Sequence, residues 1–173
     1  GYGESNMRGA YRSIGINRND FMSLIQINDN RPDDIKAIQW LSFASNAFNV
    51  MVPFYADIET TPDYLSNTTG EVSTDNFYWS SRMIAAMADA SYKKSIFHIE
   101  RYQEHVLSKG HEIINRYDDM IQNEADTDKH LALKHEANQA VADMLKAATS
   151  DTLGKVLYEL SNEMKNAYSR SDA

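Results

Sequence analysis

Five histidines are the first side chains in this sequence that could support catalysis or metal binding: His98, His105, His111, His130 and His135. His98 and His105 would lie two turns apart on one helix, whereas a single metal ion needs ligands three or four residues apart. Glu follows both His111 and His135, as in a zinc-protease helix, but no second histidine comes four residues later. We therefore expect structural or surface roles for the histidines, and no metal site.

Paired carboxylates are the second candidate, because two acids that converge can act as general acid and base. The sequence contains Asp33-Asp34 and Asp118-Asp119. Adjacent residues of a helix point in different directions, so Asp118 and Asp119 cannot converge, and we interpret them as a solvated face. The chain has no cysteine, which excludes thiol nucleophiles, disulfides and thiolate metal ligands from these 173 residues.

A third group of polar side chains interrupts the most apolar part of the chain. Ser45, Asn46 and Asn49 lie between two apolar runs, where amide groups could donate to an oxyanion or hold a substrate backbone. Asn is also an ordinary turn residue, so a turn is the alternative interpretation. Arg18 lies between two asparagines and could bind a carboxylate with two hydrogen bonds, or it could be a solvated loop charge.

Composition narrows the function classes. With 42% hydrophobic and 24% charged residues, the chain is typical of one globular domain. A net charge of -8 argues against binding to nucleic acids or to anionic membranes. No apolar run approaches the ~18 residues that a membrane span requires. The first ten residues are polar, so we expect no signal peptide and a cytoplasmic protein.

The first third of the chain reads as strands. Residues 10–16, 21–27, 38–44 and 50–55 are rich in aromatic and β-branched residues, with polar turns between them. This order predicts an antiparallel meander of four strands. Residues 38–55 show little alternation, which predicts a sheet that is covered on both faces. Residues 56–72 are expected to form a surface linker without regular structure.

From residue 73 the apolar period changes to that of helices. We predict helices over residues 77–92, 93–123, 127–148 and 153–168, with a break and a new cap at residues 149–151. The second helix should bury a stripe that includes Ile113, Tyr117 and Met120. The fold class is therefore α+β, with strands in residues 1–72 and a helical layer in residues 73–173 that packs on the sheet within one domain.

Four long segments carry a resemblance to a known family. They are YRSIGINRND (residues 11–20), IQWLSFASNAFNVMVPFY (38–55), NTTGEVSTDNFYWSSRMIAAMAD (67–89) and IERYQEHVLSKGHEII (99–114). In this order, over residues 1–123, the chain resembles the C-terminal part of bacterial dipeptidases of peptidase family C69.

The resemblance implies a fold, an activity and an incomplete chain. Such enzymes are N-terminal nucleophile (Ntn) hydrolases with four αββα layers, and they cleave dipeptides without a metal or other cofactor. Their N-terminal cysteine is the nucleophile, and its own amine, of pKa ~8, is the general base. Because this chain lacks cysteine, it would be a C-terminal fragment, inactive alone, whose catalytic residues all lie elsewhere. Asn46 and Asn49 are then predicted to approach the substrate pocket.

Two alternatives remain open at this point. The chain could be a non-catalytic helical interaction or regulatory module, or, less plausibly, a metal-dependent hydrolase that uses its histidines. A free-standing module should bury its own sheet, whereas a fragment should expose a strand edge. The partners expected for a fragment are dipeptides, the remaining N-terminal part of the parent protein, and further copies bound through exposed strands.

Overall fold

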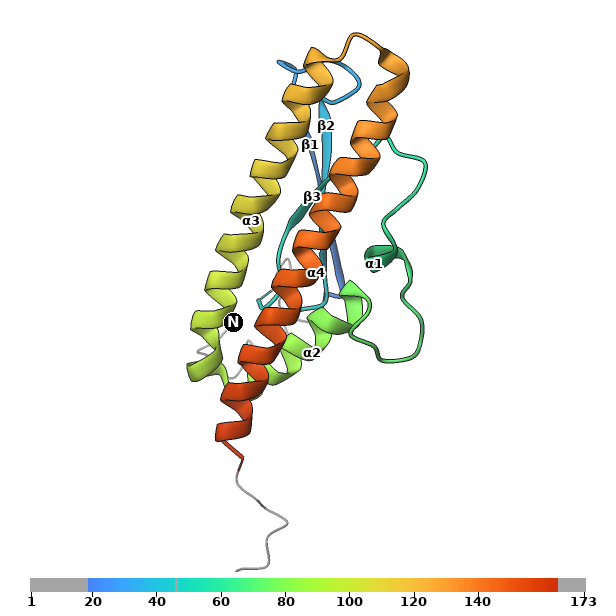
Figure 1. The fold of residues 1–173 in the computed structure, drawn as a ribbon. Helices are drawn as coiled ribbons and strands as arrows, with labels where there is room; N and C mark the ends of the chain where they lie inside the picture. Colours follow the sequence, from blue (N-terminus) through green and yellow to red (C-terminus); the bar gives the residue numbers. More distant parts are fainter. Residues whose placement is uncertain (1–18, 46, 165–173) are drawn as a thin grey trace, which may run out of the picture.

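Three antiparallel strands and two long helices dominate the computed structural model, which describes residues 19–45 and 47–164 (Figure 1). The strands β1 (Phe21–Ile27), β2 (Ala37–Phe43) and β3 (Val52–Tyr55) form a sheet in the order β1-β2-β3. The α+β class and these three antiparallel strands are confirmed, to within two residues at each end. The strand predicted for residues 10–16 lies outside the described residues.

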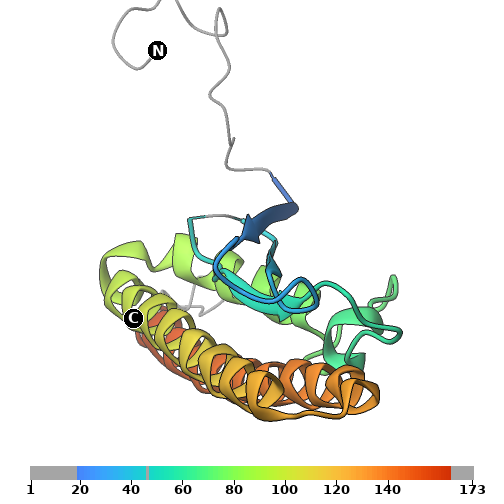
Figure 2. The same cartoon turned by 90° about the horizontal axis from the view of Figure 1, so that it is seen from above.

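Burial increases across the sheet from β1 to β3. Every residue of β1 is exposed, β2 alternates between half-buried and buried residues, and all four residues of β3 are buried. Figure 2 shows the cause, since β1 lies on the side of the sheet that is furthest from the long helices. The double cover predicted for residues 38–55 is confirmed for β3, whereas β2 is buried on one face and half-buried on the other.

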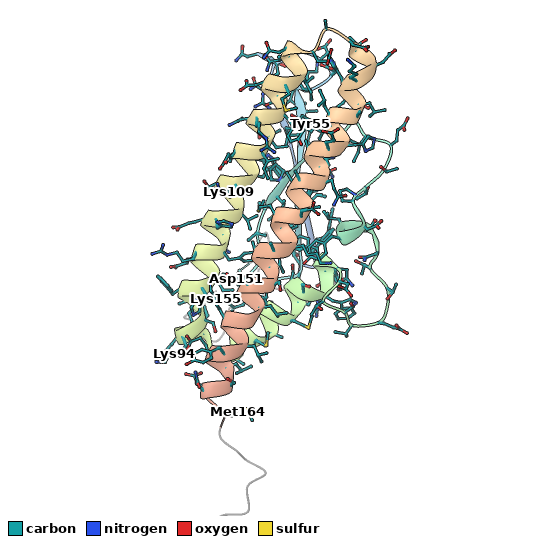
Figure 3. All side chains as sticks on the ribbon, viewed as in Figure 1. Tyr55, Lys94, Lys109, Asp151, Lys155 and Met164 are labelled. Atoms are coloured by element: carbon teal, nitrogen blue, oxygen red, sulfur yellow. The ribbon has the colours of Figure 1, made fainter. Side chains whose placement is uncertain are left out.

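The long helices α3 (Tyr92–Asn123) and α4 (His130–Asn162) form a hairpin that encloses β3. The side chain of Asn138, on α4, accepts a hydrogen bond from the backbone N–H of Tyr55 at 2.9 Å and donates one to its carbonyl at 3.1 Å. The Tyr55 hydroxyl donates to Asp118 Oδ1, on α3, at 2.7 Å. Tyr55 thus lies between the two helices (Figure 3), and Asn138 bonds the edge of β3 with which no other described strand pairs.

Two shorter helices connect the sheet to this hairpin. Helix α2 (Phe77–Ala90) begins at Asn76, whose side chain accepts a hydrogen bond from the Trp79 N–H. Phe77 packs against Phe43 of β2, with ring centroids 5.3 Å apart. The linker predicted to lack regular structure contains helix α1 (Asp63–Ser66), because Tyr64 and Leu65 are buried in the core. None of the described helices has a stretch long and apolar enough to cross a membrane.

The predicted break at residues 149–151 is wrong, because α4 runs through it without interruption. Thr149 was interpreted as part of a cap, but its hydroxyl donates to the Leu145 carbonyl one turn earlier, at 2.7 Å. The Tyr102 hydroxyl lies 2.7 Å from Thr149 Oγ1. A hydroxyl that is bonded back along its own helix does not need to start a new one.

The apolar stripe of α3 is displaced from the predicted one after its middle. The structure buries Ile114, Asp118 and Ile121. Of the predicted residues, Ile113 and Tyr117 are half-buried and pack against the core, and Met120 is exposed. Asp118 is only 3% exposed, so the interpretation of this residue as solvated is wrong. Its carboxylate can be buried because Arg31 Nη2 lies 2.5 Å from Oδ2 and Tyr55 bonds the other oxygen.

Helix α3 and strand β3 are in close contact at Gly110. A Cβ atom at this position would lie 2.7 Å from Cδ of Pro53 and 2.9 Å from Cγ. The proline ring thus fills the space that a side chain at residue 110 would take. The glycine, whose cost to helix propensity is about 1 kcal/mol, is explained by this contact.

We predict that Gly110→Ala lowers the free energy of unfolding by about 1–3 kcal/mol, because the new methyl group overlaps a proline ring that cannot change rotamer. Gly154→Ala is the matched control, since nothing lies within 4 Å of its Cβ position on α4. That variant should gain up to about 1 kcal/mol from helix propensity. Thermal unfolding followed by circular dichroism measures both, and equal shifts of the two variants would contradict the prediction.

Candidate functional site

The chain makes an irregular corner directly after β2. Ala44 has a φ of 66°, and among the described residues it is the one non-glycine with a positive φ. Its N–H donates to the carbonyl of Asp20, so it still extends the β1–β2 ladder. Such strained backbone persists only where surrounding contacts hold it, and it concentrates at binding and active sites.

Asn49 holds this corner closed. Its side-chain N–H groups donate to the carbonyls of Phe43 and Ala44, at 2.7 and 2.9 Å. The Asn49 carbonyl accepts a hydrogen bond from Gln103, on α3, at 2.9 Å. Both amide hydrogens of Asn49 are therefore used within the corner. The side chain is 6% exposed and does not line the cavity beside the corner. The turn interpretation therefore describes the contacts seen for Asn49.

A cavity of about 560 Å³ lies beside the corner, between it and α2. Small apolar side chains and one aromatic ring form part of its wall: Ala44, Ala47, Phe48, Ala85 and Ala86. Polar and charged side chains make up the rest of its lining: Asp20, Ser45, Arg82, Asp89 and Tyr92. The site thus combines a narrow apolar surface with charges of both signs.

Helix α2 contributes four of these residues from one of its faces. Arg82, Ala85, Ala86 and Asp89 follow the spacing i, i+3, i+4, i+7, which places them side by side along the helix. Arg82 forms an ion pair with Asp20, at the start of β1, and its guanidinium lies 5.8 Å from the Tyr78 ring centroid. Asp89 is exposed and forms no ion pair with any residue that the structure describes.

This arrangement can bind and orient a ligand. A guanidinium can donate two parallel hydrogen bonds to a carboxylate, and a free carboxylate can accept from an ammonium group. The alanine side chains between them leave space for a small substrate.

Sequence reasoning identified the corner but not the helix beside it. Asn46 and Arg18, which were both considered for ligand binding, lie outside the described residues. Arg82 and Asp89 were not singled out. Their signal in the sequence is two opposite charges seven residues apart with two alanines between them on the same helix face.

The histidines are dispersed, as their spacing predicts. His98 Nε2 lies 3.2 Å from Glu159 Oε1, the His111 ring lies 4.9 Å from that of Trp40, and His135 Nδ1 lies 3.2 Å from Thr60 Oγ1. In the described parts of the chain, no three His, Asp or Glu side chains converge in the way that a metal ion requires. His98, His111 and His135 therefore take part in structural contacts.

His130 is the most tightly bound of the histidines. Its Nδ1 lies 2.6 Å from Asp34 Oδ2, and its Nε2 lies 2.9 Å from the Glu124 carbonyl. The hydrogen bond to Glu124 and the Asp34 carboxylate raise the pKa of His130 above its usual value of 6.5. Nearby, the buried Lys134 ammonium lies 3.0 Å from Asp57 Oδ2 and donates to the Asp34 carbonyl. These contacts tie the loops after β1 and β3 to the tip of the helix hairpin.

Buried Tyr55 is unsuited to acid–base chemistry near neutral pH. Burial, together with the Asp118 carboxylate, raises the pKa of the Tyr55 hydroxyl far above its usual range. Burial also raises the pKa of Asp118, although its bonds to Tyr55 and Arg31 oppose this shift. Both side chains are engaged with each other, so we assign them a structural role.

A larger hollow of about 850 Å³ lies between α3 and α4. Most charges along it are already neutralised, since Lys155 lies 2.6 Å from Asp151 and His98 contacts Glu159. No strained backbone borders it. The corner cavity, with its strained residue and its unpaired carboxylate, is therefore the better candidate for a functional site.

Comparison with protein families gives one match, to a family described as peptidase family C69. The family model matches residues 1–105, which is more than half of this chain. The match includes β1, the corner after β2 and all of α2, and hence every residue that lines the corner cavity.

Several bacterial proteins are similar to nearly the whole chain. A Streptococcus pyogenes protein named probable dipeptidase A is 39% identical over 162 residues, which is 94% of this chain and 34% of that protein. A dipeptidase of Bifidobacterium longum is 36% identical and covers 98% of this chain, and dipeptidase A of Lactobacillus helveticus is 30% identical and covers 91%. The chain spans between 33% and 39% of the length of these relatives.

We predict that His130 stabilises the fold more at acidic than at basic pH. Because its pKa is raised in the folded state, its contribution is fully present below about pH 6.5 and is lost as the pH rises through the folded-state pKa. The difference in melting temperature between wild type and His130→Gln should therefore shrink from about pH 5.5 to about pH 8.5. Asp34→Asn should weaken this trend, and a difference that grows toward basic pH would contradict the assignment.

Proposed function

The chain belongs to peptidase family C69, and on that premise we propose that it is the C-terminal third of a bacterial dipeptidase. The observation that carries the proposal is similarity to dipeptidases along 91–98% of this chain, combined with coverage of only about a third of each relative. The reaction of the whole protein is then hydrolysis of the single peptide bond of a dipeptide.

The nucleophile of this proposed enzyme comes from outside the 173 residues. The chain has no cysteine, whereas the family resemblance implies an N-terminal cysteine whose own amine accepts the thiol proton. An amine of pKa ~8 can do so near neutral pH without a metal or other cofactor. We propose that the described sheet and helices form part of an αββα Ntn-hydrolase fold. The protein is further proposed to be cytoplasmic, where a cysteine-free chain folds without disulfides.

The corner cavity is the proposed contribution of this chain to the substrate pocket. It contains strained backbone at Ala44 and charges of both signs, and a dipeptide is itself a zwitterion. Asn46 and Asn49 remain predictions as substrate-binding residues. For Asn49, the contacts with Phe43 and Ala44 support a role in shaping the pocket wall.

Strand β1 supports a fragment over a free-standing regulatory module. Its apolar side chains Phe21, Met22, Leu24, Ile25 and Ile27 are between 38% and 64% exposed. Among the described strands, only β2 pairs with it, along one edge. A self-sufficient module would be expected to cover such a strand. We propose that the remaining part of the parent protein covers it.

We predict that the full-length protein hydrolyses dipeptides and that these 173 residues alone do not. Assay of both against the same dipeptide panel, at equal molar concentration, tests the proposal, because the isolated chain lacks the nucleophile. The control is the full-length protein with its N-terminal cysteine replaced by serine, which should lose most activity while remaining folded.

Turnover by the isolated chain would show that its own residues suffice and would overturn the assignment of the nucleophile. A folded full-length protein that is inert on every dipeptide would overturn the proposed function itself. A full-length protein that binds a partner protein but hydrolyses no substrate would instead favour the non-catalytic module.

We predict that the isolated chain self-associates through β1. Sedimentation velocity over increasing protein concentration should show dimers or larger species, because the bare apolar strand can pair with a second copy. Replacing Leu24 and Ile25 by lysine should shift the distribution toward monomers. Lysine at the exposed positions Leu107 and Leu157, on the helices, is the matched control. A monomer at all concentrations would contradict the prediction.

A further inference from the structure

We infer that one face of α2 recognises both charged ends of the dipeptide, with Arg82 binding the terminal carboxylate and Asp89 binding the terminal ammonium. The inference rests on the proposed dipeptidase function, and it adds how the pocket would select substrates by charge and by length. We call the four residues Arg82, Ala85, Ala86 and Asp89 the α2 slot.

The position of the slot in the fold is the first argument. All four of its residues line the corner cavity, and the opposite wall is the strained corner at Ala44 and Ser45. The slot thus faces a space of about 560 Å³, and not open solvent alone. A ligand lying along the slot would contact the corner as well as the helix.

The charges are arranged with opposite signs at opposite ends. Arg82 stands at the N-terminal end of the slot and Asp89 at the C-terminal end, on the same helix face. A dipeptide with free termini carries the complementary charges, so only one of its two orientations satisfies both residues. A ligand blocked at either terminus would leave one of the two residues without its partner.

The separation of the two charges fits a dipeptide. Seven residues of α-helix rise about 10.5 Å, and the long arginine side chain leans toward the helix N-terminus, which widens the gap between the charged groups. An extended dipeptide spans about 7 Å. A charge-assisted hydrogen bond at each end brings the total to about 12–13 Å. A tripeptide is about 3.5 Å longer and cannot reach both ends in the same way.

The alanines between the charges provide the space for the peptide. Ala85 and Ala86 occupy the middle of the slot, and Ala44 and Ala47 lie on the corner side of the cavity. Larger side chains at these positions would fill the volume in which the peptide unit has to lie.

Asp20 holds Arg82 in place while the slot is empty. The ion pair between them fixes one end of the guanidinium, and arginine has five N–H donors in all. A substrate carboxylate can therefore bind the remaining donors without breaking the contact to Asp20. Asp89 has no such partner among the described residues, so an incoming ammonium displaces only water.

The test uses the full-length protein and four alanine-based substrates. These are dialanine, N-acetyl-dialanine, dialanine amide and trialanine. The variants are Arg82→Gln and Asp89→Asn, and the matched controls are Arg116→Gln and Asp119→Asn, which change the same side-chain types at exposed positions of α3. The ratio kcat/KM is measured for each pair of variant and substrate.

We expect each slot variant to lower kcat/KM for dialanine by about 10- to 100-fold, because a hydrogen-bonded ion pair is lost. Asp89→Asn should cause no further loss on the N-acetylated substrate, and Arg82→Gln none on the amide, since these substrates lack the group in question. Wild type should cleave trialanine more slowly than dialanine, and both variants should reduce this preference. The control variants should match wild type on all four substrates.

Three results would overturn the inference. If wild type cleaves dialanine and Asp89→Asn behaves like Asp119→Asn, the slot is wrong while the dipeptidase function stands. Equal losses on blocked and unblocked substrates would assign Arg82 and Asp89 a structural role. If wild type cleaves no dipeptide at all, the proposed function fails and the slot fails with it. Unchanged melting temperatures of the variants ensure that lost activity does not reflect unfolding.

Discussion

The fold depends on a pair of hydrogen bonds that one side chain makes to a strand. Asn138 binds both backbone groups of Tyr55 at the edge of β3 where no described strand lies, and so takes the place of a neighbouring strand. Without it, a fully buried N–H and carbonyl would have no partner, which costs more than an exposed one because water cannot reach them. The same tyrosine uses its hydroxyl to bond Asp118, and Asp118 in turn pairs with Arg31. One strand residue thereby connects α3, α4 and the loop after β1.

This constraint explains the unequal burial of the sheet. The long helices pack around β3, to which they are hydrogen-bonded, and they bury all of its residues. They cover less of β2, where every second residue is only half-buried. Strand β1 lies beyond the surface that the described helices cover, and all of its residues are exposed.

The sequence could predict the parts of the fold that follow from local periodicity. Strand β1 was placed at its observed bounds, and β2 and α2 to within two residues, since apolar spacing and caps define them.

The errors arise where a contact between residues far apart in sequence determines the environment of a side chain. Thr149 was assigned to a cap because the partner of its hydroxyl, Tyr102, is 47 residues away. Asp118 was assigned to the solvent because neither Arg31 nor Tyr55 is near it in sequence. Arg82 and Asp89 were missed because the cavity that they line forms only when α2 packs beside the corner after β2.

The contact between Asn138 and Tyr55 also has a consequence for the order of folding. These residues are separated by 83 positions, so the loop between them has to close before the strand edge is satisfied. The helix hairpin can form from contacts that are near in sequence, whereas β3 cannot be locked until α4 has reached residue 138. The nascent chain therefore completes this part of the molecule late, and a polypeptide that ends before residue 138, in the first third of α4, would leave β3 without these two hydrogen bonds.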